Sequence, residues 1–525
     1  MGAERAIVIG AGFAGLSAAI SLAAGGVAVT LVESAQAPGG KARALPVGPA
    51  LVEAGPTVLT LRGVFDALFG AAGERLDDHL RLRPAAVLAR HHWPDGAALD
   101  LFADAQASHD AIGRMAGAQE AAGFRAFMAE AARLRRLLGP TFMEAARPSG
   151  PFELCARIGL HRVADLIALR PYQTLWRALG GWFRDPRLRQ LFGRYATYCG
   201  SSPFAAPATL MLVAAVEAEG VWLVDGGVSA LARALDALAG RLGVVRRYGV
   251  AATRLLVARG AVAGVELVSG ERLEARHVVA TADPAALACG RLGPEAARVV
   301  PPAPAHLRQR SLSALVWLVD APASGLALER HNIFFSGDYP AEFADLARGR
   351  LPADPTLYLC AQDAGGDPRD APAPGAPARI QLLVNAPANG DRGGPLPMET
   401  DRCQTSMLAR LARSGLSLDL ARGMSALLTP ADFERRFPST GGALYGSPSH
   451  GSAASFRRPA ARTRLPGLYL AGGGCHPGPG VPMAALSGRL AAAALAQDLA
   501  STARSRRAAM PGGMSTPSAA TVATA

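Results

Sequence analysis

The chain has 525 residues, of which 50% are hydrophobic and 18% charged, so it can bury a large core and disorder throughout is excluded. At roughly 100–200 residues per domain, this length predicts two or three domains. The net charge is +12, but the arginines are scattered and lysine occurs only as Lys41, which argues against a nucleic-acid partner. The six cysteines form no CxxC pair, so we expect a reducing cytoplasm and neither a metal site nor a disulfide framework.

The N-terminal residues predict a strand, a tight turn, a helix and a second strand. Ala6–Ile9 and Val27–Val32 are short apolar runs typical of buried strands, and residues 13–24 between them are small and apolar with helical character. Because a core strand begins so close to the N-terminus, we expect no signal peptide. No apolar run reaches the length of a bilayer-spanning helix, so the chain is expected to be soluble or peripheral.

The turn after the first strand carries the pattern GxGxxG. Gly10 suits the tight turn, Gly12 allows the backbone to approach a pyrophosphate, and Gly15 allows close packing of helix on strand. Glu33 follows the second strand, where a carboxylate can accept hydrogen bonds from ribose hydroxyls. This strand–turn–helix context predicts a dinucleotide site, but the pattern does not separate FAD from NAD.

A second glycine-rich loop, PGGKAR, follows the second strand at residues 38–43. Gly40 beside the cations Lys41 and Arg43 suits a loop that wraps a diphosphate. A surface turn with solvated charges is the alternative.

The middle of the chain changes from helix to strand. Residues 85–215 are rich in Leu, Ala and Arg and predict helices. The strands expected after them are Arg246–Leu255, Ala261–Leu267, His277–Ala280, Leu312–Val319, Ile333–Ser336, Leu357–Ala361 and Ile380–Asn385, and residues 364–378 are a Pro/Ala/Gly loop.

The C-terminal part predicts the strand Leu468–Ala471, a glycine-rich turn and a helix over Met483–Leu499. Pro482 suits a first helical turn. A helix N-terminus reached through several glycines lets backbone N–H groups meet a ligand. Residues 501–525 are rich in Ser, Thr, Ala and Gly and are expected to be a disordered tail.

Together these segments resemble the bacterial carotenoid (phytoene-type) desaturases over most of residues 5–500. The resemblance rests on the glycine fingerprint, GGKAR, Ala54–Thr57, Asp225–Gly227, Thr281–Pro284 and the closing GGGCHPGPGVPMAALSGR. That closing motif and FPSTGGALYG at residues 437–446 most resemble the subgroup that acts on acyclic hydroxylated or methoxylated carotenoids, so the resemblance implies a substrate such as 1-hydroxyneurosporene.

The resemblance implies that FAD is the bound cofactor and assigns residues to it. Gly10, Gly12, Gly15 and Glu33 would hold the ADP half, and the strand around Ala252 would contact adenine through its backbone. The other residues expected along the cofactor are Gly40, Lys41, Arg43, Gly55, Pro56, Thr57, Gly472, Gly473, Val481, Pro482 and Met483.

The implied reaction removes a hydride and a proton from adjacent carbons of a carotenoid. His476, beside the flavin loop, is the candidate catalytic residue, either as a base or as part of the pocket wall; a hydrogen-bonded loop histidine is the alternative. The electron acceptor is left open between oxygen and quinone.

A water-insoluble substrate implies contact with a membrane surface. Trp176, Trp182, Phe183 and Arg177 are candidates for that contact, because aromatic and arginine side chains at helical spacing can lie in a headgroup interface. The alternative is an ordinary amphipathic helix packed on the core. We expect a cytoplasmic protein peripherally associated with the inner or photosynthetic membrane.

Other functions within this fold stay open. A phytoene desaturase or carotenoid isomerase would share the FAD elements, and a flavin amine oxidase or a non-catalytic isoprenoid-binding protein is a more distant alternative. Amine oxidases commonly place a lysine near the flavin, and this chain has none beyond Lys41.

The predicted fold class is α/β: a discontinuous, Rossmann-like FAD-binding domain with a mixed α+β substrate domain, as in amine oxidases and phytoene desaturases. The expected FAD-binding segments are 1–84, 220–295 and 425–500. The expected substrate and membrane-contacting segments are 85–219 and 296–424.

Overall fold

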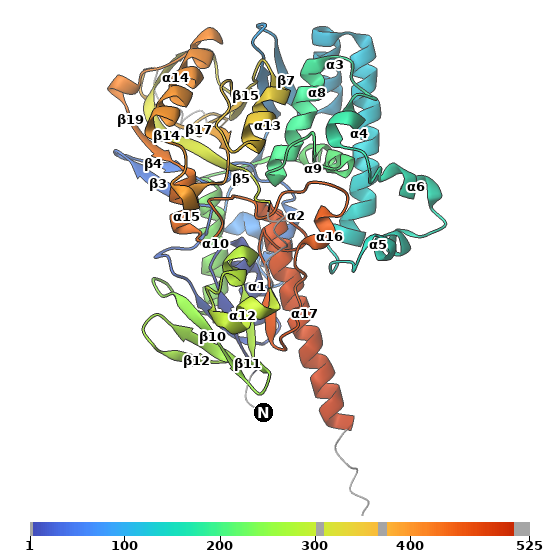
Figure 1. The fold of residues 1–525 in the computed structure, drawn as a ribbon, viewed down its shortest axis with the longest axis vertical. Coiled ribbons are helices and arrows are strands. Elements are labelled where there is room, and N and C mark those ends of the chain that lie inside the picture. Colours follow the sequence, from blue (N-terminus) through green and yellow to red (C-terminus); the bar gives the residue numbers. More distant parts are fainter. Residues whose placement is uncertain (1–3, 301–308, 366–374, 509–525) are drawn as a thin grey trace, which may run out of the picture.

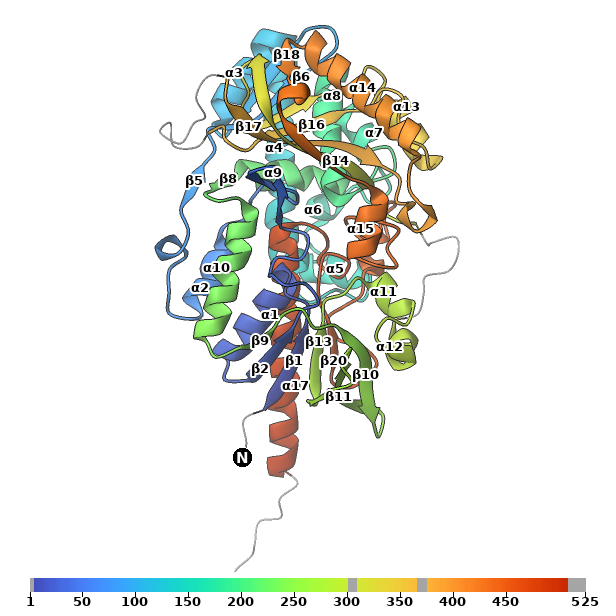
Figure 2. The same ribbon diagram turned by 90° about the vertical axis from the view of Figure 1, so that its left-hand side faces the viewer.

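The computed structural model describes residues 4–300, 309–365 and 375–508 and is built around two sheets. Figure 2 shows them one above the other, with the parallel sheet in the lower half. This parallel sheet has five strands in the order β20 (Leu468–Leu470), β13 (His277–Ala280), β1 (Arg5–Ile9), β2 (Ala28–Val32) and β9 (Val245–Arg247). The strands and helices confirm the predicted α/β class.

Helices cover the parallel sheet because its strands are apolar on both faces. The core beside it is formed with α1 (Phe13–Ala24), α2 (Gly63–Gly70), α10 (Val228–Arg241) and α17 (Val481–Ala508). The other face carries a three-stranded antiparallel sheet and two short helices: β10 (Ala252–Ala258), β11 (Ala261–Leu267), β12 (Arg272–Glu274), α11 (Pro284–Ala288) and α12 (Gly293–Val299).

The second sheet has eight strands and is mixed. Its order is β18 (Leu416–Leu418), β14 (Ser313–Gly325), β17 (Pro377–Ala386), β16 (Leu357–Ala361), β15 (His331–Phe334), β6 (Val87–His92) and β7 (Ala98–Phe102), with β19 (Met424–Leu428) also paired to β14. Two further pairs form separate two-stranded sheets: β3 (Ala44–Val47) with β4 (Ala50–Glu53), which follow each other in sequence, and β5 (Leu82–Pro84) with β8 (Trp222–Val224), which do not.

The two faces of this second sheet pack on different elements. Leu357, Leu359 and Phe334 pack on one side into a core shared with α14 (Pro397–Arg413). Ile333 and Phe335 belong to the core of a helical layer. That layer contains α3 (Ala105–Ala116), α4 (Ala118–Leu138), α5 (Pro151–Ile158), α6 (Val163–Ala168), α7 (Leu175–Leu179), α8 (Pro186–Gly193) and α9 (Leu212–Ala218).

Several predicted elements need correction. Arg246–Leu255 is not one strand, because the chain leaves the parallel sheet after β9 and re-enters as β10 of a different sheet. The region expected to be helical from residue 85 begins with β6 and β7. The last helix continues to Ala508, so the predicted disordered tail is helical over residues 501–508, and residues 509–525 lie outside the described part.

The predicted domain boundaries stay a prediction, but one of them can be compared with the strands of the second sheet. The boundary at residues 424 and 425 falls inside β19, which pairs with β14 of the eight-stranded sheet.

The remaining helices of the described part are α13 (Tyr339–Ala347), α15 (Pro430–Arg436) and α16 (Ala454–Arg457). Within the described residues, no helix combines the length and the apolar content needed to cross a membrane.

Candidate functional site

The candidate cofactor site lies at the carboxyl edge of the parallel sheet. In open parallel sheets, ligands bind in the crevice outside the carboxyl ends of the strands. Here β1, β2, β13 and β20 end side by side, because all their neighbouring pairs are parallel. The residues that follow these strands are Gly10, Glu33, Thr281 and Ala471. Two predicted site residues, Gly10 and Glu33, therefore lie at this edge beside Thr281 and Ala471, which are distant from them in sequence.

The three fingerprint glycines are needed for different reasons. A Cβ atom on Gly10 would lie 2.3 Å from Thr281 Oγ1, and one on Gly15 would lie 1.8 Å from the Gly10 carbonyl oxygen. A Cβ atom on Gly12 would meet nothing closer than 3.9 Å. Gly12 is the N-cap of α1, and no side chain caps the backbone N–H groups of its first turn. This cradle fits a pyrophosphate.

Glu33 is held in place by backbone amides. Its Oε2 accepts a hydrogen bond from Ala11 N at 2.7 Å and its Oε1 accepts one from Ala35 N at 2.8 Å. The amide of Val250 donates to the Glu33 carbonyl oxygen at 2.9 Å, which brings the start of β10, with Ala252, beside this carboxylate. A carboxylate has further lone pairs, so ribose hydroxyls fit here.

The GGKAR loop lies against the fingerprint. A Cβ atom on Gly40 would come within 3.2 Å of Gly12 Cα. Lys41 Nζ donates to the Leu444 carbonyl oxygen at 2.6 Å, and Arg43 Nε donates to the Gly40 carbonyl oxygen at 2.8 Å. Burial lowers the pKa of both cations. A buried cation held by neutral carbonyls suits an anionic ligand such as a diphosphate.

The segment Gly55–Pro56–Thr57 connects this loop to the eight-stranded sheet. A Cβ atom on Gly55 would lie 2.1 Å from the Lys41 carbonyl oxygen. Gln381 Nε2 donates to the Gly55 carbonyl oxygen at 3.1 Å. The hydroxyl of Thr57 is 2.6 Å from that of Tyr358. The cofactor edge thus meets the second sheet through residues 55–57.

The C-terminal loop lies against the same edge. A Cβ atom on Gly472, whose φ is +126°, would lie 3.3 Å from the Thr281 carbonyl oxygen. Gly473 has room for a side chain, since its Cβ would be 3.6 Å from the nearest atom, Pro479 Cα. Helix α17 then starts at Val481, which puts Pro482 and Met483 in its first turn. As at Gly12, the space left at Gly473 fits a bound group.

His476 is an anchor for this loop. It is 4% exposed, and its Nε2 is 2.9 Å from the Ala145 carbonyl oxygen, to which a neutral ring donates. The ring packs edge-on against Phe142 at 4.7 Å. Burial lowers the pKa of His476 to about 4, so it is neutral near pH 7. These contacts match the loop-histidine alternative, and a role as base stays a prediction.

Sequence reasoning missed three side chains near the site. Arg458 is 5% exposed and donates to the Gly473 carbonyl oxygen at 3.1 Å and the Ser447 carbonyl oxygen at 2.7 Å. Tyr358 and His331 lie on the second sheet and are bonded to each other at 2.7 Å. No local motif marks these residues, because their partners are far away in sequence.

The residues expected at a membrane surface require correction. Phe183 is 1% exposed and stacks on Phe192 at 4.9 Å, so it belongs to the core. Trp176 packs on Phe204 at 4.7 Å, and Trp182 lies under the Arg170 guanidinium at 4.8 Å. Of the four candidates, only Arg177 is exposed. The aromatic spacing therefore reflects packing inside the helical layer.

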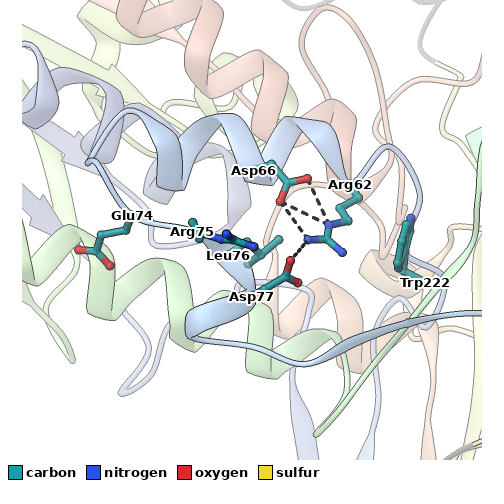
Figure 3. A pocket seen from close by; sticks show the side chains of 7 residues that line it. All are labelled: Arg62, Asp66, Glu74, Arg75, Leu76, Asp77 and Trp222. Carbon is teal, nitrogen blue, oxygen red and sulfur yellow. Dashed lines mark hydrogen bonds and ion pairs between the residues drawn. The ribbon is translucent and has the colours of Figure 1, made fainter.

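A surface pocket lies between α2 and the start of β8 (Figure 3). Arg62 bonds Asp66 and Asp77 there, and its guanidinium lies 4.8 Å from the Trp222 ring. These contacts already pair the Arg62 guanidinium, so it does not indicate a bound anion in this pocket.

Comparison with known proteins adds to this geometry. The chain matches the family described as flavin containing amine oxidoreductase over residues 13–496. It is 50% identical to a hydroxyneurosporene desaturase of Rubrivivax gelatinosus, covering 99% of this chain and 98% of that protein. Identity to the hydroxyneurosporene desaturase of Cereibacter sphaeroides is 47%, with 95% and 99% covered.

Among solved structures, a putrescine oxidase variant is similar in fold, with a TM-score of 0.60, 12% identity, and 95% of this chain and 100% of that chain covered. Three observations agree that the cofactor is FAD: the match to the flavin family, the similarity to carotenoid desaturases, and the glycine-lined site at the sheet edge. The chain thus belongs to the flavin-containing amine oxidoreductase family, among its carotenoid desaturases, and is an FAD-dependent oxidoreductase.

Proposed function

We propose that this enzyme desaturates an acyclic hydroxylated or methoxylated carotenoid, such as 1-hydroxyneurosporene, in carotenoid biosynthesis. The observation that carries the proposal is the identity of about half the residues, over nearly the whole length, to two proteins named hydroxyneurosporene desaturase. The candidate cofactor site also supports the proposal, because removing a hydride and a proton from two adjacent carbons requires a hydride acceptor. Bound FAD supplies that acceptor.

The residues of the chain contribute binding and placement. The α1 N-terminus at Gly12, which no side chain caps, favours the diphosphate, and Lys41 with Arg43 adds positive charge beside it. Arg458 and His476 hold the C-terminal loop that closes the same edge. The Thr57 hydroxyl, 2.6 Å from that of Tyr358, links residues 55–57 to the face of the second sheet that packs in the apolar core of the helical layer.

The test is a product assay with purified, FAD-loaded protein in liposomes that contain 1-hydroxyneurosporene, with oxygen or a quinone supplied as acceptor. The proposal expects a red shift of the polyene absorption and a product lighter by two hydrogen atoms. An unchanged mass with altered absorption would indicate an isomerase. Turnover of phytoene in place of the hydroxylated carotenoid would indicate a phytoene desaturase.

We further propose that the chain meets the inner or photosynthetic membrane through residues 152–172, around α5 and α6. These helices project from the side of the molecule (Figure 1). The segment exposes large hydrophobic side chains: Phe152, Leu160, Val163, Ile167 and Tyr172. Tyr172 is 94% and Phe152 77% exposed. Arg162 is exposed among them, and cations beside apolar groups suit an anionic lipid surface.

This membrane contact can be tested by co-sedimentation with liposomes that contain an anionic lipid. Replacing Phe152, Ile167 and Tyr172 together with serine is expected to abolish most of the binding. The matched control replaces Leu396 and Met398, which are 62% and 65% exposed on another part of the surface, and should bind normally. Equal binding of both variants would reject this surface.

A further inference from the structure

We propose that the chain holds a built site for the hydroxyl group of its carotenoid, in which His331 forms the hydrogen bond to that group. This inference rests on the proposed function, since it assigns the polar end of the proposed substrate to a place in the fold. The site lies where residues 55–57 of the cofactor edge meet the eight-stranded sheet.

The sheet register places the key side chains on one face. Ile333 pairs with Tyr358 and His331 pairs with Cys360 across the antiparallel strands β15 and β16. Alternate residues share a face, so His331, Ile333 and Tyr358 point to the same side. Ile333 lies in the core of the helical layer and Tyr358 packs against it. This is the face that the helical layer covers.

Hydrogen bonds connect this face to the cofactor edge. The Tyr358 hydroxyl is 2.6 Å from Thr57 Oγ1 and 2.7 Å from His331 Nδ1. Thr57 follows Gly55, which touches the backbone of Lys41. A group bound at His331 therefore lies within a few side chains of the loop that wraps the cofactor.

A second polar cluster approaches from the helical layer. Glu217 on α9 accepts hydrogen bonds from the hydroxyls of Tyr195 at 2.5 Å and Tyr198 at 2.9 Å. Arg194 donates to the Tyr198 hydroxyl at 3.0 Å. Arg194 is near enough to contribute to the lowered pKa of His331, after burial and Arg330. The two clusters are thus neighbours across one buried region.

Three buried nitrogen atoms in this region lack a partner among the described residues. They are Nε2 of His331, Nε of Arg194, and Nε2 of His91, which shares this face through its pairing with Ile333. His331, Arg194 and His91 are 2%, 7% and 0% exposed. Burial lowers the pKa of His331 to about 3, so the ring is neutral. A neutral ring offers one donor and one acceptor, and Tyr358 uses only one of them.

An alcohol can form the missing hydrogen bond to His331 Nε2. Because an alcohol both donates and accepts, it can pair with either tautomer of the ring. A buried polar group is costly unless it is hydrogen-bonded, and this holds for the imidazole and for the hydroxyl of a hydrocarbon. Binding of a hydroxylated carotenoid would satisfy both together. A carotenoid without the hydroxyl would leave the Nε2 atom unpaired.

The test compares 1-hydroxyneurosporene with neurosporene as ligands of the FAD-loaded chain in detergent micelles. Dissociation constants and kcat/KM are measured for the wild type, His331→Leu and His331→Gln. The leucine variant is expected to lose about tenfold or more in affinity for the hydroxylated carotenoid and to bind neurosporene unchanged. Glutamine, which can donate and accept, should restore part of the preference.

His92→Leu is the matched control. His92 is also a buried histidine with an unpartnered Nε2 within the described part of the chain. It pairs with Phe334, so it points to the opposite face of the sheet. This variant should keep the wild-type preference. If His331→Leu folds poorly, as judged by FAD content and melting temperature, Tyr358→Phe replaces it, because it removes the hydroxyl that orients the imidazole and should also reduce the preference.

The outcomes separate this inference from the proposed function. A wild type with equal affinity for both carotenoids, or a His331→Leu variant that weakens both equally, would overturn the hydroxyl site even where desaturation occurs. If the wild type prefers 1-hydroxyneurosporene to neurosporene and His331→Leu loses this preference, the hydroxyl site is supported. If neither carotenoid is desaturated in that case, only the proposed reaction is contradicted.

Discussion

At the scale of single residues, two glycines of the fingerprint serve different purposes. Gly15 is required by the fold, because any Cβ atom would lie 1.8 Å from the Gly10 carbonyl oxygen. Gly12 has an ordinary extended backbone and 3.9 Å of clearance, so the protein alone does not require glycine there. We propose that glycine is needed there because the cofactor diphosphate approaches it.

This difference predicts opposite behaviour of two substitutions. Gly12→Val should leave the melting temperature of the apoprotein nearly unchanged but abolish FAD retention, since the side chain fills the space of the diphosphate. Gly15→Ala should destabilise the apoprotein by roughly 1–3 kcal/mol through overpacking. Thermal unfolding without FAD and titration with FAD measure both. A yellow, fully loaded Gly12→Val protein would contradict the assignment.

Glu342 gives the chain a pH-dependent stability. It is 2% exposed, and burial raises its pKa to about 7 although Ser336 and Thr356 donate hydrogen bonds to it. A carboxyl whose folded pKa lies above its unfolded value stabilises the fold fully below the unfolded value of 4.5, and this stability is lost as pH rises through about 7.

The expected result is a wild-type melting temperature that falls from about pH 5 to about pH 8 more steeply than that of Glu342→Gln, which cannot ionise. Differential scanning fluorimetry across this range compares the two proteins. Parallel curves would show that Glu342 does not titrate in this window.

At the scale of elements, the packing of α1 on α17 explains why the first and last segments of the chain lie together. Gly488 on α17 allows this approach, because a Cβ atom there would lie 2.0 Å from the Ala14 carbonyl oxygen. The contact brings the C-terminal loop that precedes α17 to the edge where the fingerprint opens α1.

Gly488→Ala is therefore expected to lower stability by roughly 1–3 kcal/mol and to weaken FAD retention, since the helices must separate. Gly63→Ala is the control: it is also a helix position, and a Cβ atom there meets nothing within 4 Å. That variant should melt at the wild-type temperature or above it. Equal melting of both variants would contradict the close packing.

Elements with local signals were predictable from the sequence. β1, α1 and β2 have apolar runs, a glycine turn and an acidic end within residues 5–33, and the structure has them there. β6 and β7 were missed although they pair with each other across a short turn at residues 93–97, because the Leu-, Ala- and Arg-rich composition of residues 85–215 as a whole favoured helices. Phe183 was misplaced because aromatic spacing on a helix does not tell which neighbour covers it.

At the scale of the whole molecule, the site forms from segments that only the fold brings together. Sequence motifs predicted cofactor residues because each glycine loop has its own local pattern, and the assignment of these residues to FAD stays a prediction. The side chains of Tyr358, His331 and Arg458 have no such pattern, and the roles proposed for them rest on strand register, hydrogen bonds and burial. The candidate cofactor site could thus be predicted from the sequence, whereas the proposed hydroxyl site required the structure.

The central claim is that this chain oxidises a hydroxylated carotenoid with its own bound FAD. The most direct measurement is a single-turnover experiment without oxygen, in which FAD-loaded protein receives an excess of 1-hydroxyneurosporene and both flavin and carotenoid are then quantified. The account predicts one reduced flavin for each carotenoid that gains a double bond. Flavin that stays oxidised while the carotenoid is unchanged would contradict the account.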